Sequence, residues 1–318
     1  MAAEGNSIAS DALLDLLFVQ DDVGVAVWGP DLRFARVNHA LAAMNGASSD
    51  DHLGRTTDEV LPGLGRELVE EVLRSGNAAV GVELTADGER HLSASYYPLL
   101  DRDGETVGVS ALVTDITRRK RAEAELERRD RDEAFHLRVS GMLASSRDAK
   151  RMLRGFARLA VPRLADWCVI DMVQADGSLR RVALAHADRS KEDLGWEITR
   201  RYPSAPNAFE GIPKAIRSSF RELVPEIRDS FLEQIARDER HLELLLELGL
   251  RSLMIVPLTV RGCTLGAVTL AAAQSGRRYD RHDLAFAQAL ADRCALAVDN
   301  AQASAQRGEA PEALARSL

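Results

Sequence analysis

A strand pattern that runs without a loop into a charged helix is the feature that most limits how this chain can fold. Residues 107–116 alternate between apolar and small or polar side chains, which is the period of a half-buried strand. The chain then becomes charged, with seven basic and six acidic residues over 118–133. Because no glycine or proline separates the two patterns, we expect the strand and the helix to be joined directly.

Local charge pairing predicts that this helix forms while burying little surface. Thr117 is the expected N-cap. The apolar positions Ala122, Leu126, Ala134 and Leu137 form a thin stripe, which suits a weak parallel partner helix without a strong heptad repeat. Opposite charges four residues apart each stabilise a helix by about 0.2–0.5 kcal/mol. The expected pairs are Arg119–Glu123, Arg121–Glu125, Glu125–Arg129 and Glu127–Arg131.

Length and composition predict two globular domains in a soluble protein. The chain has 318 residues, which is more than one ordinary core holds, and 46% of them are hydrophobic. The net charge of -8 argues against a general nucleic-acid binder. No apolar run reaches the ~20 residues that span a bilayer, and the first residues lack the basic start of a secretory signal. We therefore expect a cytoplasmic protein with no membrane partner.

The first half predicts an α+β layout, with one antiparallel sheet and helices on one of its faces. A short amphipathic helix is expected at 11–20, and residues 39–75 are expected to be short helical pieces broken by glycine and proline. Asp87-Gly88 and Asp103-Gly104 are typical hairpin turns. The expected strands are 24–28, 33–38, 79–85, 90–99 and 106–116.

The second half has the same α+β character from about residue 150. Strands flank the turn at Asp176-Gly177, residues 188–228 are expected to be irregular, and Gly249 is expected to end a helix. Asp280 and Asp283 have the spacing of a capping box for the last helix. The expected helices are 152–165 as far as Pro162, 230–248 and 279–301, and the expected strands are 166–173, 180–187, 252–260 and 263–272.

These segments resemble two known families. Residues 11–117 resemble a PAS domain in GVAVWGPDLRFARVNHALAAMNG, HLGRTTDEVLPG and YYPLLDRDGETVGVSALVTDIT, followed by RRKRAEAEL. The D-I-T that precedes R-K-x-A-E is the most specific of these marks. Residues 135–304 resemble a GAF domain in ADWCVIDMV, DGSLRRVALAHAD, LGLRSLMIVPLTVRGCTLGAVTLA and YDRHDLAFAQALADRCALAVDNA. Residues 118–134 are then a charged helical linker, and residues 305–318 are a C-terminal tail.

The resemblance implies two sensing domains joined by a signalling helix. Each would have a central antiparallel sheet, a cavity on one face, and terminal helices that pass signals onward. In the PAS half, the last strand would be the floor of the cavity, and Asp115, Ile116 and Thr117 would couple it to the signalling helix. A twist of the sheet must then move the helix, because no flexible loop absorbs it. A linker that buries little can shift between two states.

Candidate pocket residues follow from the same interpretation. They are Trp28, Asn38 and Tyr96 in the PAS half and Trp167, Asp171 and His186 in the GAF half. Tyr97, Trp196 and Tyr202 are further candidates, although aromatic residues on strands are usually core residues. His39 is a candidate haem ligand, but a lone histidine is more often a surface or capping group. The sequence names no cofactor and no signal.

Motifs of the common enzymes do not occur in this sequence. It has no G-x-x-x-x-G-K-[ST], G-x-G-x-x-G, H-E-x-x-H or G-x-S-x-G, and neither kinase boxes, G-G-D-E-F nor the cyclic-nucleotide signature N-K-x-D-E. The three Asp-Gly pairs could serve as phosphatase metal ligands, but each stands where a hairpin needs a turn. We therefore expect a non-enzymatic chain without a metal site.

Three widely spaced cysteines predict reduced thiols, and neither a disulfide framework nor a zinc site. Cys168 and Cys294 are expected to pack as small hydrophobic residues. For Cys168, the alternative is a bilin-binding or redox role. A flavin-type PAS photosensor would need a cysteine within residues 39–75, which contain none.

The C-terminal tail bears on what the protein would regulate. The GAF helix is expected to end near residue 304 and a new helix to begin at Pro311, where EALARSL resembles the entry to a PP2C-type phosphatase. The sequence thus predicts a signal-sensing module of bacterial type. It would be a homodimer through helix 11–20 and the linker, with a small-molecule ligand or a partner protein as signal and a phosphatase or kinase as output. The alternatives are a sensor fragment truncated at Leu318, and a passive dimerisation scaffold with filled cavities.

Overall fold

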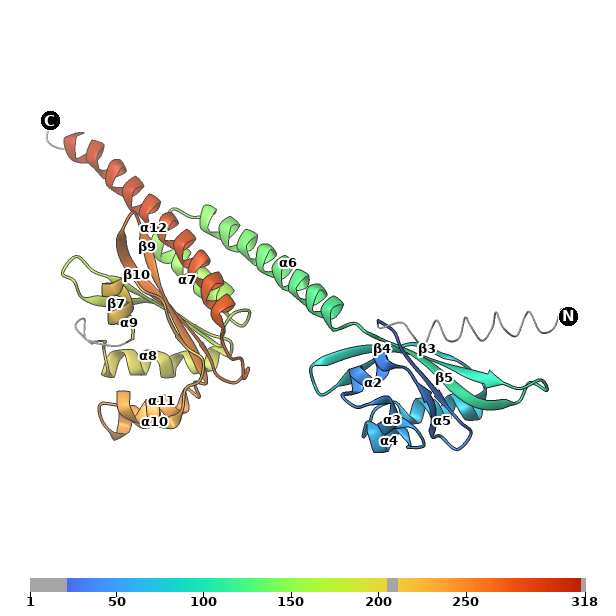
Figure 1. Ribbon diagram of the computed structural model, residues 1–318. Coiled ribbons are helices and arrows are strands. Elements are labelled where there is room, and N and C mark those ends of the chain that lie inside the picture. Colours follow the sequence, from blue (N-terminus) through green and yellow to red (C-terminus); the bar gives the residue numbers. More distant parts are fainter. Residues whose placement is uncertain (1–21, 205–210, 316–318) are drawn as a thin grey trace. The chain divides into compact units, whose positions relative to one another are not determined.

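The computed structural model describes residues 22–204 and 211–315, with side chains described as far as residue 304. The chain divides into two compact units, residues 1–129 and 130–318 (Figure 1). The helix expected at 11–20 lies outside the described residues. Each unit contains one five-stranded antiparallel sheet with helices, so the predicted α+β class is confirmed for both.

The sheet of the first unit has the strand order β2-β1-β5-β4-β3, which places the last strand in the centre. Helices α2 to α5 connect the β1–β2 hairpin to the remaining three strands and pack on one face of the sheet (Figure 1). The elements are β1 (Gly24–Trp28), β2 (Phe34–Val37), α2 (His39–Asn45), α3 (Ser49–His52), α4 (Thr57–Val60), α5 (Arg66–Ser75), β3 (Ala79–Ala86), β4 (Arg90–Leu100) and β5 (Thr106–Asp115).

Alternation along the central strands builds the core of this unit. Tyr96 of β4 pairs with Ala111 of β5, and Ala26 of β1 pairs with the same residue from the other side. Cross-strand partners share a face of a sheet, so these side chains meet Val69 and Val72 of α5 in one buried cluster. The expected Asp-Gly turns are present, with left-handed backbone at both Asp87 (φ 53°) and Gly88 (φ 72°).

The sheet of the second unit has the strand order β7-β6-β10-β9-β8. The helix α6 (Thr117–Ala144) leads into this unit, and its last turns belong to the core there. The further elements are α7 (Ala149–Ala160), β6 (Trp167–Val173), β7 (Leu179–His186), η1 (Arg189–Lys191), α8 (Glu192–Arg201), α9 (Ile212–Ser218), β8 (Glu222–Val224), α10 (Asp229–Ile235), α11 (Glu239–Glu247), β9 (Ser252–Val260), β10 (Cys263–Ala272) and α12 (Arg281–Ala315).

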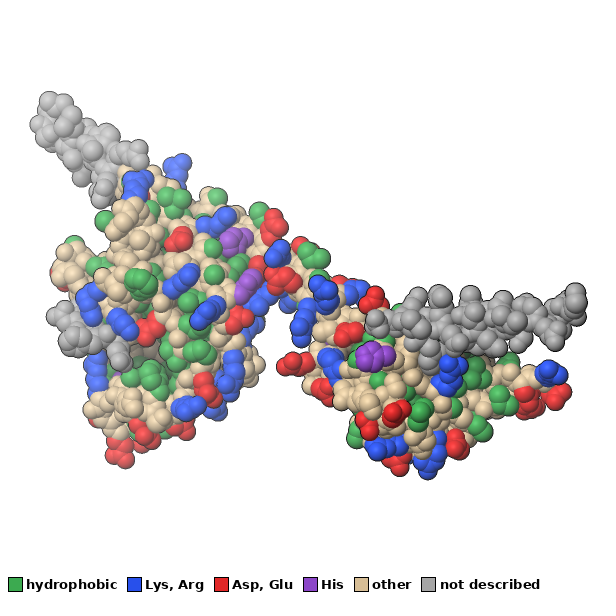
Figure 2. Space-filling model, viewed as in Figure 1, with side chains coloured by type: hydrophobic (Ala, Val, Ile, Leu, Met, Phe, Trp, Pro, Cys, Tyr) green, Lys and Arg blue, Asp and Glu red, His purple; other side chains and the backbone are tan. Residues whose placement is uncertain are grey.

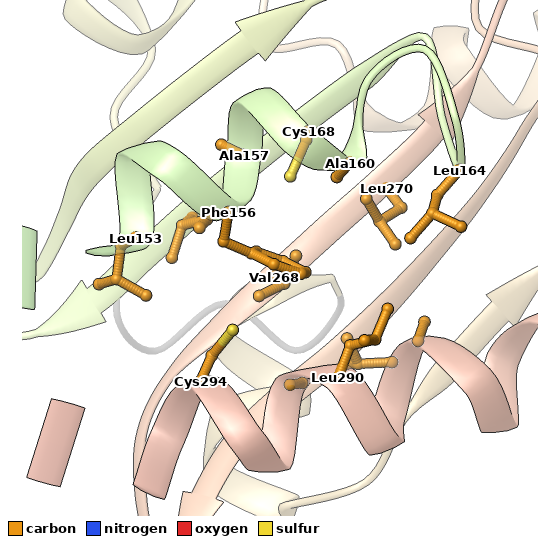
Figure 3. Packing of buried hydrophobic residues seen from close by; sticks show 14 of the residues in the cluster. Leu153, Phe156, Ala157, Ala160, Leu164, Cys168, Val268, Leu270, Leu290 and Cys294 are labelled. Atoms are coloured by element: carbon orange, nitrogen blue, oxygen red, sulfur yellow. The ribbon is translucent and has the colours of Figure 1, made fainter. Parts of the chain in front are cut away.

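Two layers of helices cover the two faces of this sheet. Ile170 of β6 and Val268 of β10 point to one face, where they pack with α7, α12 and the end of α6 (Figure 3). The neighbouring residues on each strand point to the opposite face, which α8, α9, α10 and α11 cover. The unit is therefore a three-layer α/β/α arrangement around one antiparallel sheet (Figure 1).

Three sequence predictions about helices in this unit are wrong. Residues 188–228 are not irregular, because they contain α8, α9 and β8. Helix α8 carries acidic residues in its first turn and basic residues in its last turn, a charge order that complements the helix dipole. The helix expected over 230–248 is broken into α10 and α11, because Asp238 caps α11 by accepting a hydrogen bond from the backbone of His241.

The third difference lies in the tail. Helix α12 does not end near residue 304 but runs on through Pro311 to Ala315. Alanine, the strongest helix former, occurs six times over residues 301–315 and favours this extension. The start and stop signals of the neighbouring helices are as expected. Asp280 and Asp283 form a reciprocal capping box, and Gly249 ends α11 with a φ of 66°.

Candidate ligand-binding site

A cavity of about 410 Å³ lies over the sheet face of the second unit that α8 to α11 cover. All five strands contribute to its lining, and so do side chains of the four helices. This volume is in the range of sites for small organic molecules. The apolar part of the lining comprises Leu179, Ile198, Pro203, Ile212, Pro213, Val224, Phe231, Ile235, Leu245, Leu250, Leu253 and Ile255.

Strand register decides which polar side chains reach the floor of this cavity. Asp171 of β6 lies opposite Arg181 of β7. Thr269 of β10 lies opposite Ile255 of β9, which in turn lies opposite Glu222 of β8. Because cross-strand partners share a face, one row of the sheet presents Thr269, Ile255 and Glu222 side by side.

A buried ion pair occupies one end of the floor. The Arg181 Nε donates to Asp171 Oδ1 and its Nη2 donates to Oδ2, both at 3.1 Å. The third nitrogen, Nη1, donates to the Thr199 hydroxyl at 2.7 Å, and that hydroxyl donates to the Gly195 carbonyl oxygen at 2.8 Å. All three guanidinium nitrogens are thus engaged, and the network ties the floor of the cavity to α8.

Two buried oxygens on the floor have no hydrogen-bond partner within the described part of the chain. They are the hydroxyl oxygen of Thr269 and the Oε2 atom of Glu222. The other carboxylate oxygen of Glu222 lies 4.0 Å from the Nζ of Lys214, whose side chain is half exposed. Buried polar atoms are rarely left unpaired in folded proteins, so these two oxygens mark where a ligand or water would bind.

The break between α10 and α11 brings an aromatic pair to the edge of the cavity. The rings of Tyr202 and His241 stack with centroids 4.0 Å apart. The Tyr202 hydroxyl donates to Asp238 Oδ1 at 2.7 Å, and the backbone N–H of Arg237 donates to His241 Nδ1 at 3.1 Å. Burial lowers the pKa of His241, and the hydrogen bond to Asp238 raises the pKa of Tyr202. The neutral imidazole is therefore favoured beside this cavity.

Comparison with known protein families assigns both units. Residues 18–121 match the model of the PAS fold, and residues 148–298 match the model of the GAF domain. The chain is a tandem PAS–GAF protein. Both are sensory, non-catalytic domains, so the protein is built as a signal-sensing module.

Solved structures with similar folds have low sequence identity to the PAS–GAF protein. The chromophore-binding domain of an unusual bacteriophytochrome from R. palustris is 14% identical, covering 90% of this chain and 95% of that one with a TM-score of 0.39. The second GAF domain of DevS from Mycobacterium smegmatis is 19% identical, covering 51% and 99% with a TM-score of 0.37. A domain of an HTR-like protein from Haloarcula marismortui is 22% identical, covering 30% and 98% with a TM-score of 0.26. No curated protein matches the chain in sequence.

The structure separates the candidate residues of the GAF half into two groups. Asp171 lines the cavity, and so does Tyr202. Trp167 and His186 lie instead against each other, with ring centroids 4.2 Å apart, in a separate cluster on which Trp196 packs. The Trp167 Nε1 and the His186 Nε2 are buried and have no hydrogen-bond partner among the described residues.

The candidate residues of the PAS half lie in and beside its core. Trp28 and Tyr96 are both buried, with ring centroids 6.2 Å apart, and burial raises the pKa of Tyr96 to about 12. The Asn38 side chain caps α2, since its Oδ1 accepts hydrogen bonds from the backbone of Val25 at 2.8 Å and Leu41 at 2.9 Å. A small cavity of about 110 Å³ lies elsewhere in this unit, lined by Asp31, Leu32, Thr56, Thr57, Arg66 and Val69. His39 is exposed.

The junction between sheet and helix is fastened by its own side chains. Only Ile116 separates the end of β5 from the start of α6. Helix α6 starts at Thr117, so Thr117 is not the N-cap that the sequence predicted. The backbone N–H of Thr117 donates a hydrogen bond to Asp115 Oδ1 at 2.8 Å. The Thr117 hydroxyl accepts from the backbone N–H of His91 at 2.9 Å, and the Ile116 N–H donates to the His91 carbonyl oxygen at 2.8 Å. Both contacts hold the helix start to β4.

Charge pairs hold the first turns of α6 as well. The expected pairs Arg119–Glu123 and Arg129–Glu125 are formed, each at 3.0 Å. Glu83 of β3 adds a contact to Lys120 at 2.6 Å. These pairs are largely exposed and screened by solvent, so each adds little stability.

Two of the three cysteines lie in the GAF core. Cys168 of β6 and Cys294 of α12 are fully buried among apolar side chains, as Figure 3 shows, whereas Cys263 is exposed. Burial raises the pKa of both buried thiols, that of Cys294 to about 12. Their placement fits small hydrophobic residues.

Several residues of the site were not predicted from the sequence, namely Arg181, Thr199, Glu222, His241 and Thr269. The turn at Asp176-Gly177 could have identified Arg181, because counting back along both arms of the hairpin places it opposite Asp171. Thr199 and Glu222 come from residues 188–228, which were predicted to be irregular, and His241 comes from a predicted helix whose break at Asp238 was not predicted. Among the described residues no helix has the length and apolar character of a membrane span, and none of their side chains group as metal ligands.

Proposed function

We propose that this PAS–GAF protein senses a small molecule in the GAF cavity and transmits its binding through the terminal helices to an output domain or protein. The observation that carries this proposal is the cavity of about 410 Å³, whose floor holds two buried oxygens without partners in the described part of the chain. A filled scaffold would have no such cavity, which argues against a purely passive dimerisation role.

The sheet itself offers a path from the cavity to the helices. Thr269 faces the cavity, while its neighbours Val268 and Leu270 on β10 belong to the core that α12 covers. Helix α12 is also bonded to the sheet directly, since Gln288 Nε2 donates to the Pro257 carbonyl oxygen at 3.0 Å. A ligand that shifts β10 or β9 would therefore displace side chains packed on α12.

The second path of the proposal begins in the PAS domain. Asp115, Ile116 and Thr117 would couple a movement of β5 to α6, and the absence of a loop between them supports this role. The domain limits of the proposal are 11–117 for PAS, 118–134 for the linker, 135–304 for GAF and 305–318 for the tail. Its candidate pocket residues are Trp28, Asn38 and Tyr96 in the PAS domain and Asp171 in the GAF cavity, with Trp167 and His186 in their separate cluster.

A homodimer in the cytoplasm of a bacterium is part of the same proposal. Leu126 and Leu137 of α6 are exposed by 59% and 68%, which supports a partner helix along this stretch. The chain itself would have no enzyme activity, and its output would be a PP2C-type phosphatase or a histidine kinase. As an alternative, that output would be part of one longer chain with this sensor.

Native mass spectrometry of the full chain purified from cells, together with its absorbance spectrum, tests this function. A bound small molecule or a visible band supports the sensor, and hydrogen exchange should then slow in β9, β10 and α12. A dimer without ligand that shows no exchange response to any compound in a metabolite library would contradict the sensor and support the scaffold.

A further inference from the structure

The chemistry of the cavity floor narrows the class of ligand. Glu222 and Thr269 lie on either side of Ile255 in one row across three strands. Strands are spaced by ~4.8 Å, so the two backbone positions are about 10 Å apart. A ligand that reaches both unpartnered oxygens must therefore carry polar groups at its two ends and an apolar body between them.

The Glu222 end favours a positively charged group. A carboxylate oxygen that is buried without a partner is costly, and a cation or an N–H donor offsets that cost. Lys214 lies 4.0 Å from the other oxygen and leaves Oε2 unpaired. The Thr269 end accepts either a donor or an acceptor, because a hydroxyl can play both roles.

The basic residues of the lining leave little room for an anionic ligand. Each of the three Arg181 nitrogens already donates one hydrogen bond, two to the Asp171 carboxylate and one to the Thr199 hydroxyl. Arg237 is exposed, and its Nη2 donates to the Pro203 carbonyl oxygen at 2.8 Å. A carboxylate or phosphate in the cavity would thus meet the Glu222 carboxylate, while the charge of the nearby Arg181 guanidinium is already balanced by Asp171.

We propose that the GAF cavity takes a compact apolar amine, with a protonated nitrogen at Glu222 and a hydroxyl or amide group at Thr269. This inference rests on the proposed function, since it names the class of ligand for the same cavity. The apolar body would lie over Ile255 and against Leu245 and Phe231 of the helical cover.

Tyramine is a suitable probe, because its aromatic ring carries an ethylammonium group at one end and a hydroxyl group at the other. Calorimetric titration of the full chain would compare it with 2-phenylethylamine, which lacks the hydroxyl, and with 3-(4-hydroxyphenyl)propanoate, which carries a carboxylate instead of the ammonium. We expect saturable binding of tyramine, weaker binding of 2-phenylethylamine and no measurable binding of the carboxylate.

Two variants locate the contacts. Glu222→Gln should weaken tyramine binding by about 10-fold or more, the usual loss for a charge-assisted hydrogen bond. Thr269→Val should weaken tyramine while leaving 2-phenylethylamine nearly unchanged. Glu226→Gln is the matched control, because Glu226 pairs with Arg228 and Arg278 and does not line the cavity. Thermal melting of each variant checks that it is folded.

The outcomes separate this inference from the proposed function. If tyramine binds equally to the wild type and to Glu222→Gln, or if the carboxylate binds more tightly, the proposal of an amine ligand at Glu222 is wrong. The proposal that the cavity binds a small molecule would still stand. Failure of all three probes to bind overturns the amine as well. Tyramine binding that is lost in Glu222→Gln, but leaves hydrogen exchange in α12 unchanged, upholds the amine and contradicts signalling through that helix.

Discussion

Arg181 binds both carboxylate oxygens of Asp171 across the β6–β7 ladder, each at 3.1 Å, beneath the GAF cavity. Asp171 is buried and Arg181 is mostly buried, with 7% and 15% of their side-chain surfaces exposed. Removing one partner leaves the other charge buried and unpaired, whereas removing both leaves no such charge.

We therefore predict that Arg181→Met lowers the free energy of unfolding by about 3–5 kcal/mol. In the double variant Arg181→Met/Asp171→Leu, the free energy of unfolding should fall by much less than the sum of the losses in the two single variants. Urea unfolding of the four proteins measures this coupling. Additive losses would mean that the pair does not act as a unit.

A second prediction concerns the thiols. Cys263 is exposed, whereas burial raises the pKa of Cys168 and Cys294. Because the thiolate is the reactive form, Ellman's reagent at pH 8 should modify one thiol quickly in the folded protein and the other two only on unfolding. Cys263→Ser should remove the fast phase. Three thiols that react at one rate in the folded protein would refute this placement.

The GAF unit should lose stability as the pH falls below neutrality. Burial lowers the pKa of His241 and His136 from the ordinary 6.5, so the unfolded chain takes up protons first. The free energy of unfolding therefore falls as the pH drops below 6.5 and stops falling below the folded pKa. Above 6.5 both states are neutral, and this contribution does not change.

Urea unfolding at pH 7.5, 6.5 and 5.5 measures this slope, and His241→Gln should reduce it. Carboxylates with a lowered pKa, such as Asp115, which is hydrogen-bonded by Thr117, lose their contribution only below the ordinary value of 3.8 and stay outside this range. An unchanged slope in the double variant His136→Gln/His241→Gln would show that other groups are responsible.

Asp115→Ala should loosen the start of α6 while both domains remain folded. The lost cap is worth about 1 kcal/mol, which corresponds to a rise of about fivefold in amide exchange over the first helical turn. Hydrogen-exchange mass spectrometry of residues 117–121 reads this out. Glu105→Ala, a change of an exposed carboxylate in the turn at the opposite end of β5, is the control. If both variants exchange alike, Asp115 does not fasten the junction.

Two glycines should respond to alanine in opposite directions. A Cβ at Gly266 would lie 2.2 Å from the carbonyl oxygen of Asp171, so Gly266→Ala must displace backbone and should destabilise by about 3 kcal/mol. A Cβ at Gly141 meets nothing within 4 Å inside α6, so Gly141→Ala should stabilise by about 0.5–1 kcal/mol. Thermal unfolding of both variants checks the signs. Equal effects would contradict the close approach at Gly266.

The strands and their turns could be predicted because their signals are local. The alternation of side chains predicted β5, the ten-residue strand that ends at Asp115. Each Asp-Gly pair marked a turn with a left-handed glycine. The direct join of strand and helix followed from the absence of any breaker between them. These features depend on residues within a few positions of one another, so the α+β class and the resemblance to both families could be recognised from local patterns alone.

Which side chains face the cavity depends on tertiary contacts. Trp167 and Asp171 lie on the same strand and the same face, yet α8 closes over Trp167. Gly195 of α8 lies so close to Trp167 that a Cβ added at Gly195 would be 2.9 Å from the indole ring. Asp238 likewise breaks the helix predicted over 230–248, where it caps α11 and binds the distant Tyr202 hydroxyl. Such choices depend on contacts between residues far apart in the chain, which local periodicity does not record.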